Sequence, residues 1–313
     1  MSHLWSKARA WFAGDMAPTA GLALTRESTV LAMPHIDESG AAEPIARQVA
    51  LGFRLFEANS PPDAGKRLAT ALLALRQGLP TGMLPVQVSL PDPAVSLKLF
   101  ELEAWPARHA EREALIRWRF AKALALDGLQ LACTWASLGR NESKHLVLAT
   151  AMDRQRLDTI SSACREADFL PLTVDLNANY YFNGFYNRWV PGEDGALLIV
   201  EPESTALLLW DGERRPCFLR ARWKAPSTSA EYDSILADTE WQVRAYVHAA
   251  PERRIARVLI AGGEREAFMN HLGSNPKFPC ALVDTAMHSN SQKFPLPPLQ
   301  GEASAASLAG LAR

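Results

Sequence analysis

One order of elements recurs along this chain, and the repetition restricts the fold more than any other feature of the sequence. Near the N-terminus, three short runs alternate apolar with small or polar residues, as half-buried strands do, and a helix opened by prolines follows them. The expected elements are strands at 21–25, 29–33 and 49–57 and a helix at 64–77. A second set begins at Gly195, with strands at 196–201, 205–210 and 216–222, helices at 229–248 and 265–272, and a strand at 257–261. The sequence therefore predicts an α/β protein with two similar halves.

Between the two sets lies a block, residues 83–126, that has its own order of strand, proline turn, strand and charged helix. The strands are expected at 84–90 and 94–102, on either side of Pro91-Asp92-Pro93. A helix follows Trp105-Pro106 and ends near Asp127-Gly128. Its spacing places Leu115, Trp118 and Leu126 on or near one face, and we expect all three to be mostly buried.

Three short motifs in this block carry a family resemblance. They are Leu90-Pro91-Asp92-Pro93-Ala94-Val95, Glu101-Leu102-Glu103 and Ala114-Leu115-Ile116-Arg117-Trp118. Their order and spacing resemble the PilM family of actin-like type IV pilus assembly proteins, which includes MshI-type proteins and is related to the cell-division protein FtsA. The likeness continues at lower strength to Arg313. It implies a duplicated ribonuclease H-like (actin-like ATPase) fold with an inserted small α+β subdomain.

The resemblance also implies a division of the chain and a partner. Residues 1–93, with an N-terminal helix, and residues 152–190 would form the first half, 94–151 the inserted subdomain and 191–313 the second half. In that family the protein holds the cytosolic tail of a single-span PilN-like protein in a groove between the first subdomain and the inserted one. The contact residues expected here are Pro91, Asp92 and Val95. Asp92 has capping of its own turn as an alternative role.

The hairpins that hold ATP phosphates in actin-like proteins are altered here. Such hairpins need glycine, so that backbone N–H groups can crowd a phosphate, and aspartate, because magnesium prefers hard oxygen ligands. The first reads Gly21-Leu22-Ala23-Leu24-Thr25 where the family has Gly-Ile-Asp-Ile-Gly, and the second has Glu201-Pro202-Glu203 for Asp-Ile-Gly. Ala23 cannot coordinate a metal ion, Pro202 has no N–H group, and Glu203 adds a negative charge. We therefore predict a pseudo-ATPase without a cofactor.

The adenosine-side turn keeps its glycines, Gly262 and Gly263, and the resemblance makes them a vestigial nucleotide contact. A strand-to-helix turn that needs glycine for its geometry explains them equally well. No HExxH, Walker A or GxSxG sequence occurs, and the four cysteines form no CxxC pair. We predict no catalytic residue and no metal site.

Charge and hydropathy bear on partners and location. The net charge of −1 and the pI near 6.7 provide no broad basic surface, so nucleic acid is not an expected partner. No run reaches the ~20 apolar residues that cross a bilayer. We expect a cytoplasmic protein, peripheral to the inner membrane. Residues 1–13 are expected to form a short amphipathic helix, packed on its own domain or touching the membrane.

An aromatic helix is expected to begin at Asp175-Leu176-Asn177. Its Tyr180, Tyr181 and Phe182 favour core packing over a ligand platform.

The leading interpretation is a scaffold of a type IV pilus or MSHA-like inner-membrane platform that contacts a PilN-like tail and other platform proteins. One alternative is a working actin-like or sugar-kinase-like ATPase, and another is a GspL-like cytoplasmic module of type II secretion.

Overall fold

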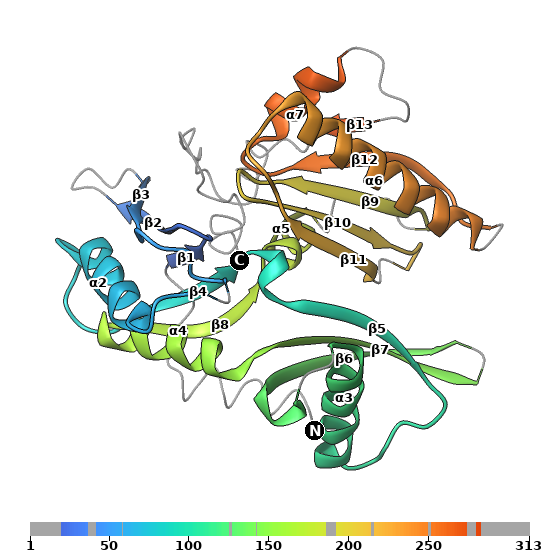
Figure 1. Ribbon diagram of the computed structural model, residues 1–313, viewed down its shortest axis with the longest axis horizontal. Coiled ribbons are helices and arrows are strands. Elements are labelled where there is room, and N and C mark those ends of the chain that lie inside the picture. The colour runs from blue at the N-terminus through green and yellow to red at the C-terminus, as the bar shows by residue number, and fades with distance from the viewer. Residues whose placement is uncertain are drawn as a thin grey trace.

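The computed structural model describes residues 20–36, 42–57, 59–124, 127–141, 143–185, 192–213, 216–249, 252–273 and 280–282. The expected N-terminal helix, Leu126 and the C-terminal segment from residue 283 lie outside the described residues. Three sheets make up the described part, one in each of the three bodies visible in Figure 1.

The first sheet has the strand order β3-β2-β1-β4-β8, with an antiparallel meander of the first three strands and parallel pairing of β1, β4 and β8. Its strands are β1 (Ala20–Leu24), β2 (Ser28–Ile36), β3 (Ala42–Ala50), β4 (Leu84–Leu90) and β8 (Phe169–Leu176). Helices α2 (Ala64–Arg76) and α4 (Arg154–Glu166) cover one face of this sheet (Figure 1). Leu68 and Leu72 of α2 and Ile160 of α4 are fully buried against it, because their helical spacing turns one apolar face to the strands.

The expected third strand, 49–57, is wrong in its position. β3 ends at Ala50, and the chain then turns so that the N–H groups of Leu51 and Leu55 donate to the carbonyl groups of Glu27 and Arg26. Both leucines are buried in the core of the first half. The apolar alternation in this segment therefore belongs to a packed turn.

The second sheet repeats the first, with the order β11-β10-β9-β12-β13. Its strands are β9 (Asp194–Val200), β10 (Ser204–Trp210), β11 (Pro216–Trp223), β12 (Ile255–Ala261) and β13 (Cys280–Leu282). Helices α6 (Ser229–His248) and α7 (Arg265–Leu272) pack on one face. Since both sheets combine a three-stranded meander with two further parallel strands in the same order, the predicted duplicated ribonuclease H-like fold is confirmed.

Helix α5 (Asn177–Phe185) joins the two halves. It leaves β8 of the first sheet and packs against the inner face of the second sheet (Figure 1). Tyr181 and Phe182 are buried there, and the Phe182 ring lies edge-on to Trp210 at 5.5 Å between centroids. The described part of the aromatic stripe is thus core, as predicted.

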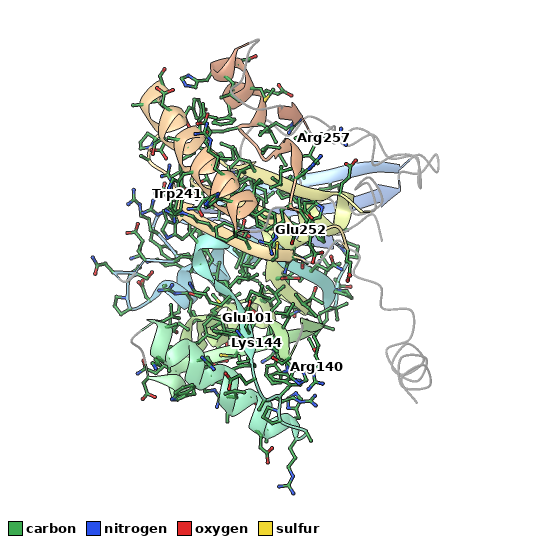
Figure 2. All side chains as sticks on the ribbon, turned by 90° about the vertical axis from the view of Figure 1, so that its right-hand side faces the viewer. Glu101, Arg140, Lys144, Trp241, Glu252 and Arg257 are labelled. Atoms are coloured by element: carbon green, nitrogen blue, oxygen red, sulfur yellow. The ribbon has the colours of Figure 1, made fainter. Side chains whose placement is uncertain are left out.

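The third sheet is small and has the order β5-β7-β6. It consists of β5 (Ser96–Leu102), β6 (Leu131–Asn141) and β7 (Lys144–Asp153), with helix α3 (His109–Leu124) on one face. An ion pair of 3.1 Å between Glu101 and Lys144 links β5 to β7 (Figure 2). The inserted α+β subdomain expected from the sequence is present.

The predicted burial of Trp118 is wrong. Ile116 and Phe120, four residues apart, face the small sheet and are fully buried, whereas Trp118 is 54% exposed. A helix turns by about 100° per residue, so Trp118 lies about 200° from each of its buried neighbours. Lys122 and Arg119 place their charges 5.6 and 5.4 Å from its ring. Leu115 is partly buried, as expected.

Candidate functional site: closed phosphate hairpins and an apolar groove

The two altered hairpins meet at the seam between the halves. The backbone N–H of Arg26, in the β1–β2 turn, donates to Glu203 Oε2 at 2.7 Å, and Glu203 lies in the β9–β10 turn of the other half. A backbone N–H in such a turn is the group that would receive a phosphate oxygen. Here a carboxylate of the same chain accepts that hydrogen bond.

The space left between the hairpins is very small. A cavity of about 20 Å³ lies there, lined by Ala23, Thr25, Pro91, Pro202, Glu203 and Trp223 among others. That volume holds about one water molecule. Next to it, the Arg26 guanidinium lies 5.3 Å from the Trp223 ring, which stacks on Phe56 at 6.1 Å. The two halves therefore contact each other directly where a nucleotide would separate them.

Groups of the same chain also contact the adenosine-side turn. Gly262 has φ +103°, and a Cβ there would lie 2.3 Å from the carbonyl oxygen of Val200, so this position requires glycine. The N–H of Gly263 donates to Glu201 Oε2 at 3.0 Å, and the Tyr181 hydroxyl donates to Glu201 Oε1 at 2.9 Å. Burial raises the pKa of Glu201 to about 7.

Glu264, the third residue of this turn, pairs with Lys224, a partner that the sequence did not reveal. The Lys224 side chain is fully buried, and its Nζ lies 2.9 Å from Glu264 Oε2, which also accepts from the Tyr232 hydroxyl at 3.1 Å. A lysine after a strand carries no local signal for such a contact. Gly262 is therefore required by the geometry of the turn, and the polar groups of the turn bind other groups of the same chain.

The three residues expected to contact a partner, Pro91, Asp92 and Val95, lie in different environments in the structure. Pro91 lines the small cavity between the halves. Asp92 is only 2% exposed, and its Oδ1 accepts the backbone N–H of Ala178 at 2.8 Å, so its side chain caps α5 and not its own turn. Burial raises the pKa of Asp92 to about 7. A carboxylate in this position cannot meet a basic residue on the surface, which leaves Val95 as the accessible member of the set.

Val95 lines a groove of about 320 Å³ between the first half and the small sheet. The groove lies where β4 and β8 end and β5 and the long strand β7 join the first half (Figure 1). Apolar side chains predominate in its lining, including Leu90, Val95, Met152, Leu157 and Val174. Thr134, Thr150, Cys133 and Asp175 are its polar members. The groove therefore lies between the first half and the inserted subdomain, the region where the resemblance leads us to expect a partner's tail.

Asp175 is a groove residue that sequence reasoning treated only as the start of a helix. Its Oδ1 accepts the N–H of Leu176 and the side-chain amide of Asn179, each at 2.7 Å. Burial raises the pKa of Asp175. A polar residue at the carboxyl end of a parallel strand is a signal that could have marked it, because ligands of α/β sheets bind there.

Other candidate sites are weaker. A wider hollow of about 880 Å³ runs beside α2 and α4, but its lining is largely polar and mixes both charges. Among the described residues, no three His, Cys, Asp or Glu side chains are grouped to hold a metal ion. Within the same residues, no helix is long and apolar enough to cross a bilayer.

Comparisons with known proteins support the fold. No family model and no curated protein matches the chain. A chain in a structure described as a PilM–PilN type IV pilus biogenesis complex superposes with a TM-score of 0.62 at 16% identity, over 94% of this chain and 96% of that one. The cytoplasmic domain of EpsL, an inner-membrane component of the type II secretion system of Vibrio cholerae, gives a TM-score of 0.50 at 13% identity, over 94% and 93%. The likeness to PilM-type proteins is thereby confirmed at the level of the actin-like fold.

Proposed function

We propose that this protein is a cytoplasmic scaffold in the inner-membrane platform of a type IV pilus or MSHA-like system. In this proposal it holds the cytosolic tail of a single-span, PilN-like partner in the groove beside Val95. The observation that carries the proposal is an apolar groove between the first half and the inserted sheet, in a chain whose phosphate hairpins are bridged by its own Glu203. The proposal is supported by the likeness in fold to a chain from a PilM–PilN complex.

The groove suits an extended peptide. β8 and β6 each form the last strand of their sheet among the described residues, and both contribute residues to the groove wall. In β8 a register shift makes Leu172 an extra residue opposite β4, but pairing is regular from Thr173 to Leu176. A tail can therefore add backbone hydrogen bonds along this regular part and place alternate side chains against the apolar lining.

Nucleotide is not part of the proposed function. A triphosphate would have to displace Glu203 from the Arg26 N–H and then lie beside that carboxylate, where like charges repel. The altered hairpins also lack an aspartate to hold magnesium, since Ala23 and Pro202 cannot serve. We propose a pseudo-ATPase whose halves are held closed without ligand.

Fluorescence anisotropy tests the proposal with synthetic peptides that copy the cytosolic N-termini of single-span proteins encoded beside this one. We expect a Kd in the micromolar range, about −8 kcal/mol. Val95→Glu should abolish binding, because it places a charge on the apolar wall. Leu73→Glu is the matched control, since Leu73 is 48% exposed on α2, outside the groove. Failure of every peptide to bind, or equal binding by both variants, contradicts the proposal.

Thermal denaturation with MgATP tests the pseudo-ATPase. A ligand at 100 times its Kd stabilises a protein by about 2.7 kcal/mol, so specific binding gives a clear melting shift. We expect no shift at millimolar MgATP. A reproducible shift at millimolar MgATP favours the alternative of a working actin-like ATPase.

The likeness to the EpsL domain favours a second candidate, a cytoplasmic module of a type II secretion system. The peptide panel should therefore include tails of single-span proteins from such a system. Selective binding of those peptides would assign the groove to that machine.

A further inference from the structure

Asp175 contributes a carboxyl group to the wall of a predominantly apolar groove. It is the penultimate residue of β8, two residues before α5 begins, and it lines the groove together with Val174 and Met152. Two hydrogen bonds reach its Oδ1, from the N–H of Leu176 and the side-chain amide of Asn179. Among the described residues, Oδ2 has no hydrogen-bond donor or cation within bonding distance. One oxygen of this carboxylate is therefore available to a ligand in the groove.

The charges around Asp175 increase the need for a cation. The charge of Asp175 raises the pKa of the nearby Asp92 carboxyl, and Glu201 acts on Asp92 in the same sense. None of these three carboxylates forms an ion pair with a lysine or arginine of the described chain, although the N-terminus of α5 offsets part of their charge. Asp175 is the one carboxyl group in the described lining of the groove, which contains no lysine or arginine.

We propose, on the basis of the proposed function, that Asp175 determines the specificity of the groove by pairing with a lysine or arginine of the bound tail. The pair forms as a hydrogen bond from the ammonium or guanidinium to Asp175 Oδ2, while apolar side chains of the tail pack on Val95, Met152 and Leu157. Apolar lining next to Asp175 reduces the contact of the pair with water, which strengthens a charge-assisted hydrogen bond.

The chemistry of the partner fits this requirement for a physical reason. Short cytosolic segments of single-span membrane proteins are rich in lysine and arginine close to the membrane, because these residues set the orientation of the span. A tail that alternates apolar side chains with one such cation therefore matches both the lining and the charge of the groove. Tails that lack a cation at the matching position are selected against by the uncompensated carboxylate.

A double-mutant cycle on the full chain tests the pairing. The probe is the fluorescein-labelled tail peptide that binds the parent protein, with each lysine or arginine replaced in turn by glutamine. Asp175→Asn keeps the Oδ1 acceptor for Leu176 and Asn179 and removes the charge. Asp158→Asn is the control, an exposed carboxylate on α4 outside the groove.

We expect Asp175→Asn to weaken the parent peptide by roughly 10- to 100-fold, and one glutamine peptide to bind Asp175→Asn at least as tightly as it binds the parent. Asp158→Asn should bind like the parent. Unchanged affinity in Asp175→Asn, or losses that simply add in the cycle, overturns the role of Asp175 and leaves the groove in place. If no tail peptide binds the parent protein, the proposed function fails and the pairing with it.

Discussion

Removal of the Glu203 carboxylate is the most direct perturbation of the seam between the halves. In Glu203→Ala the Arg26 N–H loses an acceptor at 2.7 Å. A hydrogen bond to a charged group contributes about 1.5–3 kcal/mol when buried. Glu203 is half-buried, and the adjacent cavity of about 20 Å³ admits one water molecule that can replace the acceptor. We therefore expect the free energy of unfolding to fall by about 1–2 kcal/mol.

Two measurements check this expectation. Urea denaturation gives the free energy of unfolding, and amide hydrogen exchange reports directly on the Arg26 N–H, which should be protected in the parent and exchange faster in Glu203→Ala. Glu203→Gln retains an oxygen acceptor and should lose less stability than the alanine variant. Glu252→Ala is the matched control, an exposed carboxylate on the second half (Figure 2).

The reasoning is refuted if Glu203→Ala is as stable as Glu252→Ala and the Arg26 amide exchanges at the parent rate. The carboxylate would then be a bystander, and another contact would hold the hairpins together. We expect Glu203→Ala to remain unresponsive to MgATP, because Ala23 and Pro202 still deprive the hairpins of a magnesium ligand and an N–H group.

Three further predictions follow from burial and backbone geometry. The pKa of Glu201 is raised from 4.5 to about 7 in the folded state, so the folded protein binds this proton more tightly than the unfolded chain does, and the free energy of unfolding should fall as pH rises from about 4.5 to 7. Urea titrations at pH 5 and pH 8 measure this fall, which should be smaller in Glu201→Gln. Gly262→Ala should cost ~2 kcal/mol or more, because it combines φ +103° with a clash against backbone. At Gly263 the φ is not in the left-handed region and the nearest atom to a Cβ is Glu201 Oε2 at 3.2 Å, so Gly263→Ala should cost less in the same titration. Trp118→Ala should cost less than ~1 kcal/mol and Phe120→Ala ~3–5 kcal/mol, and equal melting temperatures for the two variants would contradict the described packing of α3.

Local signals in the sequence determined most of the elements. Helices α2, α6 and α7 occur at or close to their expected positions, because helical spacing and the residues that start and stop a helix act within a few turns of chain. The strands of the second meander were likewise predicted, since Asp211-Gly212 is a local turn signal between alternating runs. Recurrence of this order predicted an α/β protein with two similar halves, and the family resemblance implied the duplicated ribonuclease H-like fold.

The same local signals failed where the neighbours of a residue come from far along the chain. The spacing around Trp118 suggested an apolar face, but the small sheet received Ile116 and Phe120, and only the docking of α3 decides which face is buried. Asp92 reads as a turn residue, yet the placement of α5 by the second sheet brings the Ala178 N–H to its carboxylate and buries it.

In the phosphate hairpins, too, some properties follow from the sequence and others only from the tertiary structure. The sequence by itself determined that Ala23, Pro202 and Glu203 replace the residues that a nucleotide requires. Only the tertiary structure decided what Glu203 does, because its partner, the Arg26 N–H, lies 177 residues away in the other half. A backbone N–H carries no sequence signature, so a contact to it depends on how two sheets pack and not on which residues they contain.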